Sequence, residues 1–175
     1  MKSVLLKRAA IVFIAAVTMS VSAVAQKKGE MAAGANLLFG STTGYSNVGL
    51  GAKFLYNVTD PIRLAGEFDY FLKKDYVNFW DFSVYGQYLF PLAEKIAAYP
   101  EVGLGVLGTT VSIPTINLGE LGSIGGSASH SEFAFSLGGG IDYQLTSNLT
   151  LNGGLRIKLV SGNWFNILAG IAYKF

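Results

Sequence analysis

The residues of this chain whose types could support catalysis are its only histidine and the two residues that follow it, His130-Ser131-Glu132. An imidazole, a hydroxyl and a carboxylate are the groups that activate a nucleophile in many hydrolases. Adjacent residues of a strand point to opposite faces, so His130 and Ser131 would not meet unless the chain bends there. We therefore interpret the three residues as part of a surface loop and predict that the protein is not an enzyme.

No other group of residues in the sequence indicates catalysis, a metal or a cofactor. The chain has no cysteine and one histidine, and its carboxylates are scattered along the sequence. Protein zinc sites are built mainly from cysteine and histidine, so the usual ligands are missing. The sequence also lacks a glycine-rich loop that leads into a phosphate-binding helix. We predict no catalytic residue, no metal ion and no cofactor.

The remaining charged residues alternate with apolar ones. In the segment 62–73, Arg63, Glu67 and Asp69 occupy positions between apolar residues. A strand would place the apolar residues on one face and the charged residues on the other, whereas a helix would scatter both around its circumference. Alternation of this kind recurs in eight segments, near residues 30–40, 48–58, 62–73, 78–90, 98–110, 131–145, 149–160 and 164–175.

The lengths of these segments suit a membrane-spanning sheet. A transmembrane strand takes about 9 to 11 residues, and an open sheet edge cannot be left in lipid, so such a sheet must close. The sequence therefore predicts an all-β fold, an eight-stranded antiparallel up-and-down transmembrane β-barrel. A secreted lipocalin-type barrel, with its apolar face inside, is the alternative that alternation alone leaves open.

The first 25 residues resemble a secretory signal peptide. Lys2, Lys7 and Arg8 precede an apolar run over residues 9–19, and Ala23-Val24-Ala25 has the small residues of a cleavage site. The run is shorter than the roughly 20 apolar residues of a membrane-spanning helix, so a retained anchor is the weaker interpretation. We expect residues 1–25 to be removed during export.

Residues 26–175 would then form one outer-membrane domain. Cleavage takes away three basic residues and no acidic one, so 13 basic and 11 acidic residues become 10 and 11, a formal net charge of −1. A mature chain of that charge gives little support to binding of nucleic acid. We expect no nucleic-acid partner.

The final segment has the most regular alternation. Its apolar face would carry Phe165, Ile167, Ala169, Ile171, Tyr173 and Phe175. This pattern resembles the C-terminal insertion signal of bacterial outer-membrane barrels, a terminal phenylalanine preceded by apolar residues at every second position. The resemblance implies that Ile171, Tyr173 and Phe175 form an assembly signal read by the barrel-assembly machinery. It favours the membrane barrel over the lipocalin-type barrel.

A second resemblance lies in Gly138-Gly139-Gly140-Ile141-Asp142-Tyr143-Gln144-Leu145-Thr146-Ser147-Asn148-Leu149-Thr150-Leu151. This segment is similar to a hairpin of small outer-membrane barrels of the OmpA transmembrane-domain and OmpX type. The resemblance implies a location in the cell outer membrane, reached through the periplasm. Outer-membrane lipid and lipopolysaccharide are the partners that this location implies.

The charged residues on the polar face of the strands are expected to form a network in the lumen, made of Lys53, Arg63, Glu67, Asp69, Asp81, Glu101, Glu132, Asp142, Arg156 and Lys158. An eight-stranded barrel is just wide enough for side chains to fill it. Burying an unpaired ion costs several kcal/mol, so we predict that these groups pair across the lumen as a polar core. The alternative is a narrow conduit in which one basic group exchanges acidic partners.

Aromatic residues near the strand ends are expected to form two girdles at the membrane interfaces. Many of the following residues, which lie near strand ends or within strands, are expected to belong to these girdles: Tyr56, Tyr70, Phe79, Trp80, Tyr88, Phe90, Tyr99, Tyr143, Trp164, Phe165, Tyr173 and Phe175. The alternative is that they fill the core of a soluble protein.

The connections between the segments differ in length. Short turns at 57–61, 91–95 and 146–148 are assigned to the periplasmic side, where proline, asparagine and aspartate favour tight reversals. Longer connections at 41–47 and 112–130, with a short one at 74–77, fall on the extracellular side. The 112–130 segment is rich in glycine and serine, and we predict that it is a mobile loop.

The sequence thus predicts an integral outer-membrane barrel with a structural or surface-display role, such as adhesion or ligand capture through the 112–130 loop. A narrow porin-like channel for ions or small solutes is the alternative. A lipid A-modifying enzyme is the remote one, because some outer-membrane deacylases are eight-stranded barrels that use histidine, serine and glutamate. Those enzymes require a His-x-Ser spacing, which this chain lacks.

Overall fold

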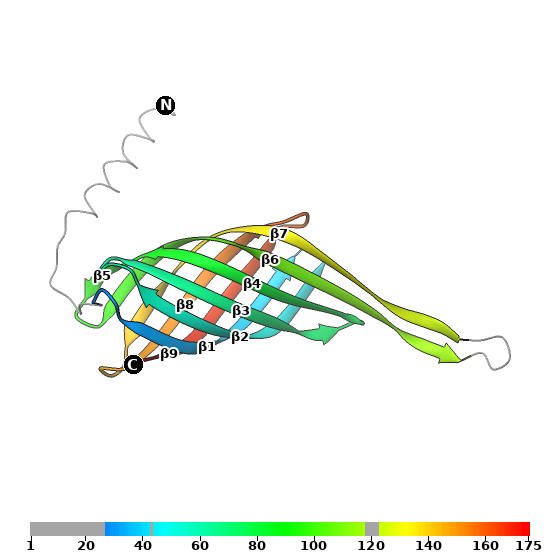
Figure 1. Ribbon diagram of the computed structural model, residues 1–175, viewed down its shortest axis with the longest axis horizontal. Helices are drawn as coiled ribbons and strands as arrows, with labels where there is room; N and C mark the ends of the chain where they lie inside the picture. Colours follow the sequence, from blue (N-terminus) through cyan, green and yellow to red (C-terminus); the bar gives the residue numbers. More distant parts are fainter. Residues whose placement is uncertain (1–26, 43, 118–122) are drawn as a thin grey trace, which may run out of the picture.

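The computed structural model describes residues 27–42, 44–117 and 123–175, which form a closed barrel of antiparallel strands (Figure 1). The predicted signal peptide, residues 1–25, lies outside the described residues. No helix within the described ranges is long and apolar enough to cross a membrane. The strands are β1 (Met31–Thr42), β2 (Tyr45–Asn57), β3 (Ile62–Lys74), β4 (Val77–Tyr88), β5 (Phe90–Ala93), β6 (Ile96–Asn117), β7 (Ser123–Gln144), β8 (Leu149–Leu159) and β9 (Trp164–Lys174).

The strands follow one another around the barrel in chain order, and β9 pairs with β1 to close it. The short strand β5 continues the line of β4 after Leu89, and both pair with β6. Because β4 and β5 occupy one position in the barrel wall, eight strand positions surround the lumen. This confirms the predicted eight-stranded up-and-down barrel. The extra strand β5 overlaps the segment predicted as the turn 91–95, so the turn is shorter than expected and comprises residues 94–95.

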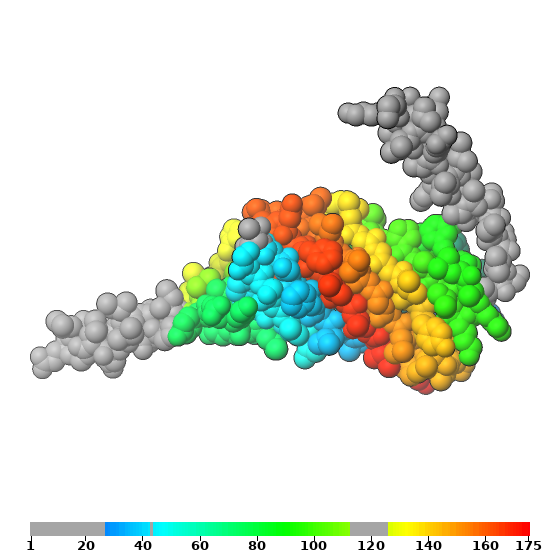
Figure 2. Space-filling model, turned by 180° about the vertical axis from the view of Figure 1, so that it is seen from behind, coloured from blue at the N-terminus to red at the C-terminus, as the bar shows by residue number. Residues whose placement is uncertain are grey.

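The apolar face of the sheet is the outer face. Large apolar side chains such as Leu50, Phe133 and Leu155 are more than half exposed on the outside. Figure 2 shows this outer wall from behind, with the strands packed side by side. An apolar exterior and a polar interior are the arrangement of a membrane barrel, so the lipocalin-type alternative is wrong.

The hairpin formed by β6 and β7 is much longer than the sequence analysis predicted. Backbone pairing continues to Asn117 and Ser123, with an irregularity between Ile113 and Ile116. The prediction of a loop over 112–130 is therefore wrong for its described part, and residues 118–122 lie outside the described residues. A two-stranded ribbon outside the membrane needs no buried apolar face, so its strands lack the alternation on which the prediction relied.

We call the part of β6 and β7 that lies beyond their pairing with β4 and β8 the ribbon. It projects well beyond the other strands (Figure 1). We name this end of the barrel the hairpin end. The opposite end carries the connections after β2, β5 and β7 and is named the turn end. The connection between β3 and β4 is as tight as predicted, because Asp75 and Tyr76 both take the left-handed backbone conformation with φ of 50° and 66°.

Inward-facing glycines make room for aromatic rings in the lumen. A Cβ on Gly103 would lie 2.3 Å from the ring of Tyr85, and a Cβ on Gly40 would lie 2.3 Å from the indole of Trp164. Both rings are buried. Glycine is therefore required at these two positions for the rings to cross the interior.

The variant Gly103→Ala is expected to lower the free energy of unfolding by about 1–3 kcal/mol, because its methyl group displaces the buried ring of Tyr85. The matched control is Gly66→Ala on the outer face, where a Cβ would meet nothing within 4 Å. Urea unfolding of the refolded variants in detergent micelles measures both changes. Equal stability of the two variants would contradict this packing.

Candidate functional site

The lumen is the candidate functional site because it gathers the buried charged side chains of the barrel. Each of these side chains occupies an inward-facing position on its strand, between neighbours that are exposed or partly exposed. The predicted residues found buried there are Lys53, Arg63, Glu67, Asp69, Asp81, Glu101, Asp142, Arg156 and Lys158.

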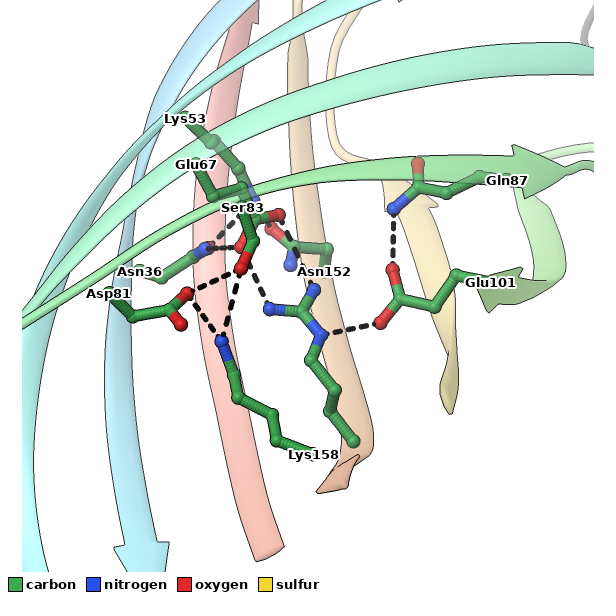
Figure 3. Close-up of polar contacts among 10 residues, drawn as sticks. Asn36, Lys53, Glu67, Asp81, Ser83, Gln87, Glu101, Asn152 and Lys158 are labelled. Atoms are coloured by element: carbon green, nitrogen blue, oxygen red, sulfur yellow. Dashed lines mark hydrogen bonds and ion pairs between the residues drawn. The ribbon is translucent and has the colours of Figure 1, made fainter. Parts of the chain in front are cut away.

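Arg156 is the centre of the largest group of contacts. Its Nε donates to Oε1 of Glu101 at 2.8 Å, and its Nη1 donates to Oε2 of Glu67 at 3.0 Å. The ring of Tyr85 lies against the guanidinium, 3.7 Å from Cζ to the ring centroid. Gln87 donates to the other oxygen of Glu101 at 2.8 Å (Figure 3). One guanidinium thus holds two carboxylates that come from β3 and β6.

Arg63 forms a second ion pair nearer the turn end. Its Nη1 donates to Oδ2 of Asp142 at 2.7 Å, and its Nε donates to Oε1 of Gln87 at 2.6 Å. Arg63 and Gln87 are direct partners in the β3–β4 ladder, whereas Asp142 lies on β7. The ion pair therefore crosses the lumen.

Lys53 is buried among neutral amides rather than paired directly with a carboxylate. Its Nζ donates to Oδ1 of Asn36 at 2.8 Å and also to Oδ1 of Asn152 (Figure 3). Asn36 in turn donates to Glu67 at 3.4 Å. The two asparagines link the ammonium of Lys53 to the group around Arg156. Neither asparagine belongs to the network predicted from the sequence, because that network was restricted to charged residues.

Lys158 forms a further ion pair, with Asp81. Ser83 donates to Oδ1 of Asp81 at 2.7 Å, and Lys158 lies 3.4 Å from the Ser83 hydroxyl (Figure 3). Asp69 is the direct ladder partner of Asp81 and is fully buried. Neither carboxylate oxygen of Asp69 has a hydrogen-bond partner among the residues that the structure describes. The structure thus brings Asp69 beside this ion pair without bonding it to the pair.

Glu132 is the predicted lumen residue that lies elsewhere. It is only partly buried and accepts hydrogen bonds from the backbone nitrogen and the hydroxyl of Ser161, at 3.1 and 2.7 Å. The reason is its position beyond the pairing of β7 with β8, which begins at Phe135. His130 and Ser131 are both exposed on the ribbon, and no described hydrogen bond joins them.

An apolar plug fills the lumen at the hairpin end. Its buried members are Leu38, Phe71, Leu107, Ala134, Trp164 and Leu168, with Tyr45, Phe79 and Val160 packed against them. The rings of Phe79 and Trp164 meet edge to face with centroids 4.6 Å apart, and those of Phe71 and Trp164 are 5.3 Å apart. The Trp164 indole donates to Asn166 at 2.5 Å.

Three of the aromatic residues named as girdle candidates are part of the interior instead. Trp164 and Phe79 belong to the plug, and Tyr99 is buried beside Arg63, with its ring centroid 5.1 Å from Cζ. These three residues are therefore not among those that form the girdles. The alternation of each strand places them on the inner face.

The lumen is open at the turn end. A cavity of about 70 Å³ lies there, and its lining includes Lys53, Arg63, Tyr99 and Asp142. No group of three or more histidine, cysteine, aspartate or glutamate side chains in the described part of the chain could hold a metal ion. The site is thus a blind cavity that ends at the charged network and the plug.

The variant Arg156→Met is expected to lower the free energy of unfolding by about 3–5 kcal/mol, because it leaves Glu67 and Glu101 buried without their guanidinium. Adding Glu67→Gln and Glu101→Gln to the same chain should restore part of the loss. Lys73→Met, at an exposed position, is the control. If Arg156→Met unfolds at the same urea concentration as Lys73→Met, the charged network does not stabilise the fold and the prediction is wrong.

The comparisons with known proteins agree with this architecture. The family model described as outer membrane protein beta-barrel domain matches residues 9–175. No curated protein sequence matches the chain. Neisserial surface protein A has a similar structure, with 17% identity, a TM-score of 0.62, and coverage of 83% of this chain and 96% of that one.

Two other solved barrels are similar to the same extent. Ail, the attachment invasion locus protein of Yersinia pestis, shares 18% identity at a TM-score of 0.59, covering 85% of this chain and 99% of that one. The N-terminal β-barrel domain of OprF from Pseudomonas aeruginosa shares 17% identity at 0.57, covering 85% and 100%. Another structure of Ail is a complex with the heparin analogue sucrose octasulfate. None of these proteins is named as an enzyme.

At such low identities, the similarity to these structures establishes only a shared fold, that of a membrane barrel. The family model matches nearly the whole chain. The apolar exterior and the charged interior described above are the features that this family requires. The chain belongs to the outer membrane protein beta-barrel domain family and is a protein of the cell outer membrane.

Proposed function

We propose that the protein is a closed structural barrel that presents the β6–β7 hairpin outside the cell as a binding element. The observation that carries this proposal is the contrast between a filled lumen and a projecting ribbon. The turn end would then face the periplasm, as the short connections favour.

The filled lumen argues against the alternative of a narrow channel. Conduction requires a continuous wet path, but the plug around Phe71 and Trp164 packs aromatic rings across the interior. Below the plug, Arg156 and Lys158 are held by carboxylates and are about 1% exposed. An ion crossing the barrel would have to break these ion pairs in a site that has little water to replace them.

The ribbon has free backbone edges that suit it to binding. On β6, pairing with β4 ends at Val111, and on β7, pairing with β8 begins only at Phe135. The backbone N–H of Ser112 still donates to the carbonyl of Tyr76, so residues 113–117 and 123–134 have a neighbouring strand on one side only. The unpaired N–H and C=O groups of such an edge accept an added strand.

An extended peptide is the ligand that this edge favours. The segment 112–130 contains no lysine or arginine, so it has no fixed positive charge for a polyanion. A polyanion such as the heparin analogue bound to Ail would require basic side chains, and this segment has none. Exposed serine side chains along the ribbon, such as Ser127 and Ser129, supply further polar contacts.

The same proposal covers the membrane and assembly partners. The apolar outer face fits outer-membrane lipid and lipopolysaccharide. Ile171, Tyr173 and Phe175 project from the outer face near the turn end, with 40%, 56% and 67% of their surface exposed. We include their recognition by the barrel-assembly machinery in the proposal, and we assign no catalytic role to His130 or Ser131.

Shortening the hairpin tests the proposed binding role. We expect protein in lipid nanodiscs to select members of a phage-displayed library of random linear peptides, because the ribbon edge pairs with extended backbone. A variant in which residues 112–131 are replaced by Asn-Gly should lose at least about 90% of this capture. Heat-modifiable gel mobility verifies that the shortened barrel is folded.

A variant with the same two-residue turn in place of the connection at 145–148 is the matched control and should retain capture. Equal capture by the intact and the shortened protein would overturn the proposed role of the hairpin. An epitope tag at residue 120 that antibodies detect only in permeabilised cells would overturn the proposed orientation.

A further inference from the structure

The charges buried in the described part of the lumen do not balance. Four of them are basic and five are acidic: Lys53, Arg63, Arg156 and Lys158 against Glu67, Asp69, Asp81, Glu101 and Asp142. A buried net charge is costly because the surrounding strands and lipid respond weakly to it. The interior therefore has one negative charge in excess.

The contacts locate this excess charge. Arg63 neutralises Asp142, and Arg156 together with the nearby Lys53 matches Glu67 and Glu101. The remaining group is Lys158 with two carboxylates, of which it contacts only Asp81. Asp69 is the acidic residue left without a basic partner.

Asp69 is also the least satisfied polar residue of the lumen. Its side chain is fully buried, and both of its oxygens lack a hydrogen-bond partner. It faces Asp81 across the β3–β4 ladder, and Oδ2 of Asp81 is unpartnered as well. A Cβ on Gly51 would lie 2.1 Å from Oδ1 of Asp69, so the carboxylate sits in a space that only glycine leaves. Three carboxylate oxygens thus share one closed part of the lumen.

We propose that the Asp69–Asp81 carboxylate pair binds one monovalent cation, either a proton or an alkali-metal ion. One positive charge cancels the excess of the described interior, whereas a divalent ion would leave the interior positive. A shared proton lets one carboxyl donate to the other, as in carboxylate pairs that cannot both ionise. A sodium or potassium ion would instead use the same oxygens as hard ligands.

The surroundings of the pair confine the bound cation. The charged groups that act on Asp69 are Glu67 on its own strand, Asp81 on β4, and Arg156 and Lys158 on β8. The plug, with Phe71 and Leu38, separates the pair from the hairpin end. The cation would therefore exchange from the turn end. This site does not depend on the proposed surface role.

The variant Asp69→Asn tests the proposal, because it removes the excess charge and keeps the shape of the side chain. We expect it to fold and to unfold at a higher urea concentration than the wild type at about pH 9 in buffer without alkali-metal ions. Asp142→Asn is the matched control: the same change at a buried aspartate that pairs with Arg63 should lower the midpoint. Failure of Asp69→Asn to fold would overturn the proposal, because the carboxylate would then be needed as an anion.

Two series of measurements distinguish the cations. If the pair holds a proton, the folded protein binds one more proton than the unfolded chain, so the wild-type midpoint falls as the pH rises from about 6 to about 9. If it holds sodium, the midpoint at about pH 9 falls when sodium is replaced by N-methyl-D-glucamine at constant ionic strength. In either case the midpoint of Asp69→Asn should change less than that of the wild type.

A spectroscopic measurement reports the same site directly. In protein labelled with ¹³C at the aspartate carboxyls, the signal absent from Asp69→Asn should be that of a neutral carboxyl for the proton, or of a carboxylate shifted by sodium for the metal ion. A signal of an ionised carboxylate that is insensitive to sodium, with equal responses of the wild type and Asp69→Asn in both series, would overturn the proposal.

Discussion

The structure depends on the satisfaction of polar side chains inside a narrow, closed barrel. Lipid surrounds the outer face, so every charged side chain on the inner face must find its partner within the lumen. Arg156 meets this requirement with Glu67 and Glu101, and Arg63 meets it with Asp142. These ion pairs connect strands that are not neighbours in the barrel, and they stabilise the packed interior.

Because the lumen is filled unevenly, the two ends of the barrel differ. The hairpin end is closed by the rings of Phe71, Phe79 and Trp164, and the turn end retains a water-accessible cavity. We propose that a barrel filled in this way serves as a rigid support rather than as a conduit. The β6–β7 ribbon, which needs no packing against the barrel wall beyond Val111, is then free to act as the contact surface.

The alternation of residues predicted the barrel and the inner face correctly because the side-chain period of a strand is two, independent of tertiary contacts. It placed Lys53, Arg63 and Arg156 inside, but the partners of Arg156 could not be read from the sequence. Which residues meet across the lumen depends on strand tilt and stagger, and these appear only when the barrel closes. The predicted charge network left out Asn36 and Asn152 because it was restricted to ionisable groups, and Trp164 was listed among the girdle candidates although its position in β9 is inward. The ribbon was missed because exposed strands need no apolar pattern.

Single-channel conductance in a planar lipid bilayer tests most directly whether the lumen is sealed. Residues 26–175, the expected mature chain, would be refolded, their folding verified by heat-modifiable mobility, and their insertion verified by protease protection of the barrel. We expect no discrete current steps from inserted protein, because the plug and the ion pairs leave no continuous wet path. Discrete steps that change in size in Arg63→Ala or Arg156→Ala would contradict it, because they would show ions passing through the charged network.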